Sequence, residues 1–365
     1  MSSELLRDEL SSFTGINLTS LFDNWIFNPG FSHFHVDSME TVDLGGGNFS
    51  ASVYIRQKLK GATQFHVNVP LTVTLYDEQL IPHEFHETVS GQNSTIQLDV
   101  NFNPLMVALN ADDKLNLAQA ADEVVIAQTG NYNFKYGRMN VDVTDVQDSV
   151  LLRIEHHWVA PDNDHLPGNA TKISDYRYWT VGGIHLEKMA AQAEIFYDGR
   201  NSTSNRNGQL DNTLLEAGED SVILLYRENS SEKWTEYQFY SKNTHATTLD
   251  KFGKMELSQL MAGEYTFGIG SSVVGIKKKD PKAEEQIEII PNPLVTGNAV
   301  SVIMPKLAEP AKLEVYNLSG KRMLYHQFDG DHLLKLDAFS NGTYVLFVRS
   351  LSGKYLASAK LIIQH

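Results

Sequence analysis

The sequence of 365 residues contains no cysteine. This absence excludes disulfide bonds, thiolate-bound metal sites and cysteine nucleophiles. Stability must therefore come from the burial of apolar groups, and the hydrophobic content of 42% is sufficient for real cores.

Long apolar runs are also absent, since none reaches the roughly 18 residues that a membrane span requires. The segment Met1–Asp8 carries acidic residues and lacks an apolar core, so the sequence predicts no signal peptide in the given chain. We therefore expect no membrane span.

Basic residues are fewer than acidic ones, 30 against 45, and the formal net charge is −15. Such a chain repels phosphate backbones and anionic lipids, so we expect no nucleic-acid partner. The basic cluster Lys277–Lys279 is followed at once by Asp280, which is typical of a linker and not of a binding patch.

The common catalytic motifs are missing. The sequence has no Gly-x-Ser-x-Gly, no phosphate loop, no dinucleotide fingerprint and no His-Glu-x-x-His. His83 and His86 approach the last motif but have one residue too few between them. They lie in strand-like sequence, where positions i and i+3 face opposite sides, so we favour a structural role over metal binding.

Helical periodicity is confined to the N-terminus, in residues 2–28, where Asn17 can cap a second short helix after Gly15. The two apolar stripes are too short to stand alone and need a partner surface. They consist of Leu6, Leu10 and Phe13, followed by Leu18, Leu21, Phe22, Trp25 and Ile26.

From Phe31 onward the hydrophobic period is two, with Gly and Pro between short runs. The predicted fold class is mainly β, with tandem antiparallel β-sandwich domains behind a short helical segment. We expect a short helix at 113–122 and an exposed polar loop at 201–212. The predicted domains are 1–28 (helical), 29–112 (β-sandwich), 113–274 (second β domain), 275–286 (charged linker) and 287–365 (β-sandwich).

The last domain carries turn and strand marks in a characteristic order: a rigid Pro-Asn-Pro turn, a Leu-Ser-Gly-Lys hairpin turn, an Asn-Gly turn and a closing strand. The residues that define them are Pro291, Asn292, Pro293, Gly320, Lys321, Gly342, Tyr344 and Lys360. This set resembles the C-terminal sorting domain of the type IX secretion system of the Bacteroidetes.

The resemblance implies export across the outer membrane by its secretion machinery, and release from or anchoring at the outer cell surface. Export without disulfides suits a bacterial protein. An unrelated Ig-like sandwich is the alternative, because such folds host many functions.

A second resemblance covers roughly residues 2–110. A helix with Phe22 and Trp25 runs into Asn-Pro-Gly, with Pro29 and Gly30, and then into strands. This is similar to the junction in the aminopeptidase N family of zinc peptidases, where a Phe-rich helix ends the catalytic domain before a β-sandwich. Residues 1–28 would then be a helical remnant of a catalytic domain.

The family's zinc site needs His-Glu-x-x-His and a downstream Glu, which this chain lacks. The resemblance thus implies a non-catalytic C-terminal region that supports an absent N-terminal catalytic domain. No cofactor is expected in this chain, and zinc is expected in that domain.

The other candidate metal ligands also have structural explanations. Glu155 and His157 share a strand face, as do His33 and His35, but for each pair we favour structural polar contacts over metal binding. Asp162 and Asp164 suggest calcium ligands without the full alternating carboxylate pattern.

The alternative function is a free-standing secreted surface protein that binds carbohydrate or peptide. Exposed aromatic side chains would line its site. The candidates are Tyr132, Tyr136, Tyr176, Tyr178 and Trp179. The structural alternative is that these residues belong to the core and edges of a β-sandwich.

Overall fold

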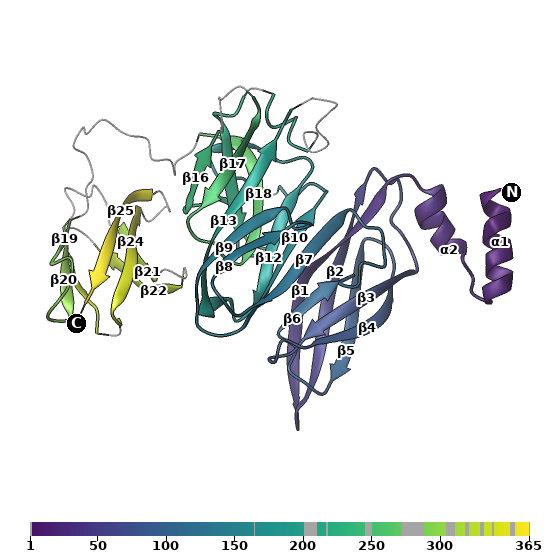
Figure 1. The fold of residues 1–365 in the computed structure, drawn as a ribbon, viewed down its shortest axis with the longest axis horizontal. Coiled ribbons are helices and arrows are strands. Elements are labelled where there is room, and N and C mark those ends of the chain that lie inside the picture. Colours follow the sequence, from purple (N-terminus) through teal and green to yellow (C-terminus); the bar gives the residue numbers. More distant parts are fainter. Residues whose placement is uncertain are drawn as a thin grey trace. The chain divides into compact units, whose positions relative to one another are not determined.

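The computed structural model describes residues 2–163, 165–200, 210–216, 218–244, 250–271, 288–303, 311–317, 321–328, 332–337, 339–350 and 355–364. The mainly β fold class is confirmed, and the chain divides into two compact units, Met1–Gly275 and Ile276–His365 (Figure 1). The predicted linker at 275–286 and residues 201–209 of the predicted polar loop lie outside the described residues.

The first unit begins with α1 (Ser3–Thr14), α2 (Thr19–Phe22) and the π-helix η1 (Asp23–Phe27). The Ser2 hydroxyl caps α1, and Gly15 ends it in the left-handed conformation that glycine adopts most easily. The predicted Asn17 cap is displaced by one residue, since Leu18 is the N-cap of α2, and the Asn17 side chain accepts a hydrogen bond from the Thr19 amide in the turn before it.

Two antiparallel sheets follow and enclose one apolar core. The first has the order β1 (Phe31–Gly45), β2 (Asn48–Lys60), β5 (Asn93–Val100), and the second has the order β4 (Pro82–Val89), β3 (Val69–Tyr76), β6 (Met106–Leu109). Alternate residues of β2 and β5 turn inward, as the period of two predicts, and pack against β3, most of which is buried.

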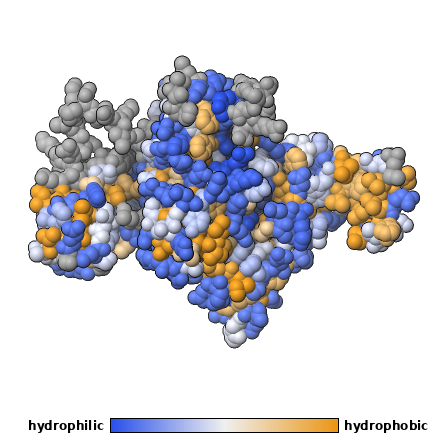
Figure 2. Space-filling view, viewed as in Figure 1, coloured by the Kyte–Doolittle hydropathy of each residue, from blue (hydrophilic) through white to orange (hydrophobic). Residues whose placement is uncertain are grey.

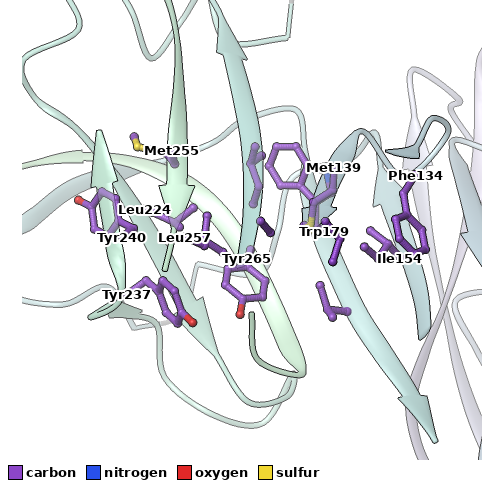
Figure 3. Packing of buried hydrophobic residues seen from close by; sticks show 14 of the residues in the cluster. Phe134, Met139, Ile154, Trp179, Leu224, Tyr237, Tyr240, Met255, Leu257 and Tyr265 are labelled. Atoms are coloured by element: carbon purple, nitrogen blue, oxygen red, sulfur yellow. The ribbon is translucent and has the colours of Figure 1, made fainter. Parts of the chain in front are cut away.

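The next sandwich pairs two larger sheets. One has the order β15 (Thr235–Glu236), β14 (Val222–Arg227), β18 (Gly263–Gly270), β12 (Tyr178–Ile184), β10 (Val150–His157), β7 (Gln119–Ile126), with β11 (Ala170–Ile173) beside β18. The other has the order β16 (Tyr240–Asn243), β17 (Phe252–Leu257), β13 (Met189–Asp198), β9 (Met139–Val146), β8 (Gly130–Phe134). A 3-10 turn, η2 (Leu186–Lys188), precedes β13. Figure 3 shows the core between them, built from aromatic, methionine and aliphatic side chains.

The predicted helix at 113–122 is wrong. Residues up to Ala118 are irregular, and β7 begins at Gln119, which pairs with His157 of β10. The Ala118 amide donates to the Ser32 carbonyl, and the Trp158 amide donates to the Ala118 carbonyl. These tertiary hydrogen bonds outweigh the modest helical preference of an Ala- and Leu-containing segment.

The second unit is a smaller pair of antiparallel sheets. One has the order β19 (Glu288–Ile290), β20 (Ala299–Ile303), β23 (His332–Lys335), and the other has the order β22 (Arg322–Phe328), β21 (Ala311–Asn317), β24 (Gly342–Ser350), β25 (Tyr355–Ile363). Buried aliphatic residues of both sheets form one core. None of the helices in the described parts of the chain is long and apolar enough to span a membrane.

Candidate functional site

The junction residues anchor η1 to the first sandwich. Phe22 is buried, and the Trp25 indole donates to the Asn116 carbonyl at 3.2 Å and meets the edge of His66. Asn24, which the sequence pattern did not single out, bonds both backbone groups of Val67. A buried amide inside an apolar helical stretch is the signal that would have identified it.

Gly30 is required where the helical segment meets β1. Its φ is +85°, and a Cβ atom there would lie 2.3 Å from the Lys60 carbonyl oxygen. Only glycine fits this close backbone approach, at the point where Phe31 pairs with Lys60. Pro29 precedes it on the surface.

The helix α1, by contrast, buries none of its residues. Its apolar side chains remain in solvent, with Phe13 89% exposed and Leu10 38% exposed, and Figure 2 shows hydrophobic residues gathered over the N-terminal helices. We call this the apolar helical surface; its members are Leu5, Leu6, Leu10, Phe13 and Ile16.

Three histidines form a buried cluster where β1 of the first sandwich meets β10 and β12 of the second. His33 Nε2 lies 2.8 Å from His157 Nδ1, and His157 Nε2 lies 2.9 Å from the Thr180 hydroxyl. Tyr178 stacks on His157 with ring centroids 4.2 Å apart. His35 Nε2 lies 3.5 Å from Glu264.

The cluster is electrically neutral. Burial lowers the pKa of His35 and of His157 to about 3, and the neighbouring Lys58 pushes both in the same direction. Burial also lowers the pKa of His33 well below its usual value. Since the nitrogens that face each other share one proton, one ring donates and the other accepts.

These residues do not fit a zinc ion. His33 and His157 direct nitrogens at each other, and among the described residues no group of three or more His, Asp or Glu side chains is arranged to hold a metal. His83 and His86 lie on β4 at positions that face opposite sides. His83 pairs with Asp77 at 2.9 Å and stacks on Phe102.

The carboxylates near the cluster are engaged in ion pairs. Glu155 shares a face with His157, with 3.6 Å between Oε2 and Nε2, but also accepts from Arg153 at 2.7 Å. Asp162 pairs with Arg56 and Lys58, each at 2.9 Å. Asp164 lies outside the described residues. These contacts favour the structural explanation of both acids.

The proposed aromatic surface site is wrong for two of its members. Tyr178 and Trp179 are 1% and 0% exposed, because β12 lies inside its sheet with both faces covered. Tyr176 lies under the Lys60 ammonium, the Tyr132 hydroxyl donates to the Gln128 carbonyl, and Tyr136 is exposed. These five side chains do not form one site.

The turn residues of the last domain hold its closing strand. The Asn292 amide donates to the Lys360 carbonyl at 2.6 Å, and its oxygen accepts from the Ile362 amide at 2.9 Å. The Lys321 amide donates to the Asn317 side chain. Gly342 begins β24, and the buried Tyr344 donates to the Ser340 carbonyl. Pro291 and Pro293 flank Asn292 in the irregular segment after β19, while Gly320 lies outside the described residues.

Asn292→Ala is expected to destabilise the second unit by about 1–3 kcal/mol, because two backbone groups of β25 lose their partner. Thermal unfolding of the full chain should show a lower midpoint for this unit only. Asn298→Ala, which removes an exposed side-chain bond to Asp337, is the matched control. Equal losses in both variants would contradict the bridging role.

Comparisons with known proteins do not identify a family for this chain. No protein-family model matches the chain, and no curated protein matches it. Among solved structures it is similar to the dimeric latent PorU from Porphyromonas gingivalis, at 9% identity and a TM-score of 0.18. The alignment covers 92% of this chain and 34% of that one, so this chain spans about a third of its length. A TM-score this low carries no information about function.

Proposed function

We propose that this chain is the non-catalytic, C-terminal region of a secreted aminopeptidase-N-like metallopeptidase. Its two N-terminal β-sandwiches support a helical zinc catalytic domain outside the chain. Its last domain acts as a type IX sorting domain, which engages the secretion machinery and delivers the protein to the outer cell surface.

The observation that carries the proposal is the contrast between η1 and α1. Asn24 and Trp25 fix η1 to the first sandwich, whereas no described residue covers the apolar helical surface. Full burial of a Leu or Phe side chain contributes about 1.5–3 kcal/mol, so covering even three of these side chains would stabilise a domain contact by several kcal/mol.

The occupant we infer is helical. Leu6, Leu10 and Phe13 are spaced i, i+4 and i+7 along α1, which makes a ridge suited to the groove of another helix. Nothing in the described residues supplies such a helix, since the other described elements are strands and short turns. In this proposal, the partner domain binds the zinc ion.

Binding tests the docking surface. A catalytic domain of the aminopeptidase N type, expressed from the same genome, is expected to bind the purified chain in titration calorimetry. The double variant Leu10→Asp/Phe13→Asp should weaken binding at least tenfold, because it places two charges in the contact. The control Val42→Asp/Leu44→Asp changes two other exposed apolar residues, in β1, and should bind as the original chain does.

Two results would overturn the proposal. One is an equal loss of binding in both double variants, or no binding by the original chain. The other is purified chain that holds stoichiometric zinc and releases amino acids from peptides without any partner.

A further inference from the structure

A hollow of about 460 Å³ opens at one end of the second sandwich. It lies where the turn between β8 and β9 approaches the end of β13 and the start of β17. It is lined on its charged side by Lys135, Arg138, Arg177 and Arg200, with Asp198 beside them. His156, which is 1% exposed, also lines it.

His156 has a buried donor without a partner. The Trp158 indole donates to His156 Nδ1 at 2.9 Å, so Nδ1 must accept and the ring proton must reside on Nε2. Burial, with Arg177 and Arg138 nearby, lowers the pKa of the ring and keeps it neutral. Among the described residues, Nε2 has no hydrogen-bond partner, but the atom is closed to solvent, so a ligand in the hollow does not reach it.

The charge of the hollow selects an anion. Among the described residues, four cationic side chains and one carboxylate line it, and counting Asp211, the partner of Arg177, still leaves a net positive charge. This contrasts with a formal net charge of −15 for the whole chain. Asp211 and Asp198 hold the planar guanidinium groups of Arg177 and Arg200, which fixes donors suited to a carboxylate or sulfate.

A second hollow, of about 540 Å³, continues the first across the outer face of the sheet. The two share Asn133 and Asn140. Some of the side chains that line the second hollow both donate and accept hydrogen bonds, and others only accept them. Sugar hydroxyl groups can pair with both kinds. The lining side chains include Asn131, Gln192, Ser241, Asp142, Glu194 and Glu256.

An apolar platform lies beside the charged hollow. The rings of Phe196 and Phe252 are nearly parallel, with centroids 6.1 Å apart, and Phe196 is 39% exposed. The Arg200 guanidinium lies 4.2 Å from the centroid of the Phe252 ring, so Phe196 is the ring that can pack against the C–H face of a sugar. A peptide is less suited to this groove, because peptides commonly add to the edge of a sheet, and this groove crosses a face.

We propose that the two hollows form a binding groove for an oligosaccharide with one acidic terminal sugar. The anionic group of that sugar accepts from the cations of the first hollow. The following sugar rings are neutral and lie along Asn133 and Asn140 toward the carboxylates of the second hollow. This goes beyond the proposed function and does not depend on it.

Calorimetry with the full chain and a trisaccharide that carries a single terminal uronate tests the groove. The uronate, or a sulfated trisaccharide, is expected to bind at least tenfold more tightly than the carboxyl-reduced trisaccharide, and salt should weaken the binding. Which anion binds more tightly identifies the acidic group.

Lys135→Glu should weaken uronate binding at least tenfold. Lys233→Glu makes the same charge change at an exposed lysine that does not line the hollows, and should have no such effect. Asn131→Ala/Gln192→Ala, at residues that line only the second hollow, should weaken trisaccharide binding but not monosaccharide binding. Equal binding of the carboxyl-reduced sugar, equal losses in the two lysine variants, or tighter binding of an acidic peptide would overturn the proposal.

Discussion

The first unit is expected to lose stability steeply as the pH falls from 6.5 to 4. The cause is the buried cluster of His33, His35 and His157, together with His156. Each is neutral in the folded protein because burial lowers its pKa, to about 3 for His35 and His157.

The direction of this change in stability follows from the number of protons that the folded and unfolded states bind. In the unfolded chain these rings titrate near pH 6.5, so below that pH the unfolded state binds more protons than the folded state. Stability is complete above about pH 6.5 and is lost as the pH falls toward 3, by up to about 1.4 kcal/mol per pH unit for each histidine. Protonating both His33 and His157 would also place two N–H groups against each other at 2.8 Å.

Urea unfolding at pH 8, 7, 6 and 5 measures this loss. We expect a slope of free energy on pH that exceeds that of a single histidine. His86→Gln, at an exposed histidine, should leave the slope unchanged. The double variant His35→Gln/His157→Gln should reduce the slope, even if it is less stable at pH 8. A free energy of unfolding that does not change between pH 7 and pH 5 would contradict the account.

Trp179→Ala is expected to destabilise the first unit by about 3–5 kcal/mol. Trp179 is fully buried between the sheets, where it stacks on His156 with ring centroids 5.0 Å apart and meets the edge of Phe267 at 5.2 Å. Arg177 covers its ring at 4.7 Å. Figure 3 shows it within the core and not at a surface. Its truncation leaves a cavity that these neighbours cannot close.

Chemical denaturation should show this loss as a lower midpoint. Tyr136→Ala is the control, because Tyr136 is 55% exposed, and it should change the free energy of unfolding by less than about 0.5 kcal/mol. A Trp179→Ala variant as stable as the control would mean that residue 179 is not a core residue.

The fold followed from local patterns to a large extent. Alternating runs such as Thr95–Val100 became strands with alternate burial, and the helical period of residues 2–28 became α1, α2 and η1. The error at 113–122 arose because hydrogen bonds from Ala118 to Ser32 and Trp158 are tertiary and leave no local signal. The same limit explains why His33 and His157, which are 124 positions apart, could not be paired.

The site residues also divide into those that the local sequence predicts and those that depend on tertiary structure. The bonds of Asn292 to β25 and the close approach at Gly30 lie at positions that turn chemistry had singled out. The sequence did not predict the groove beside His156. Its residues come from β8, β9, β13 and β17, and their order in space depends on how the sheet is assembled. The burial of Trp179 was not predicted, because an aromatic residue in a strand has the same sequence pattern whether its side chain faces solvent or the core.

The central claim is that this chain serves a zinc peptidase without containing its active site. The coding DNA immediately upstream of Met1 in the natural gene tests it most directly. The account predicts an open reading frame that continues upstream and encodes a signal peptide, His-Glu-x-x-His and a downstream Glu ligand. An in-frame stop codon, or an upstream frame without that zinc motif, would contradict it.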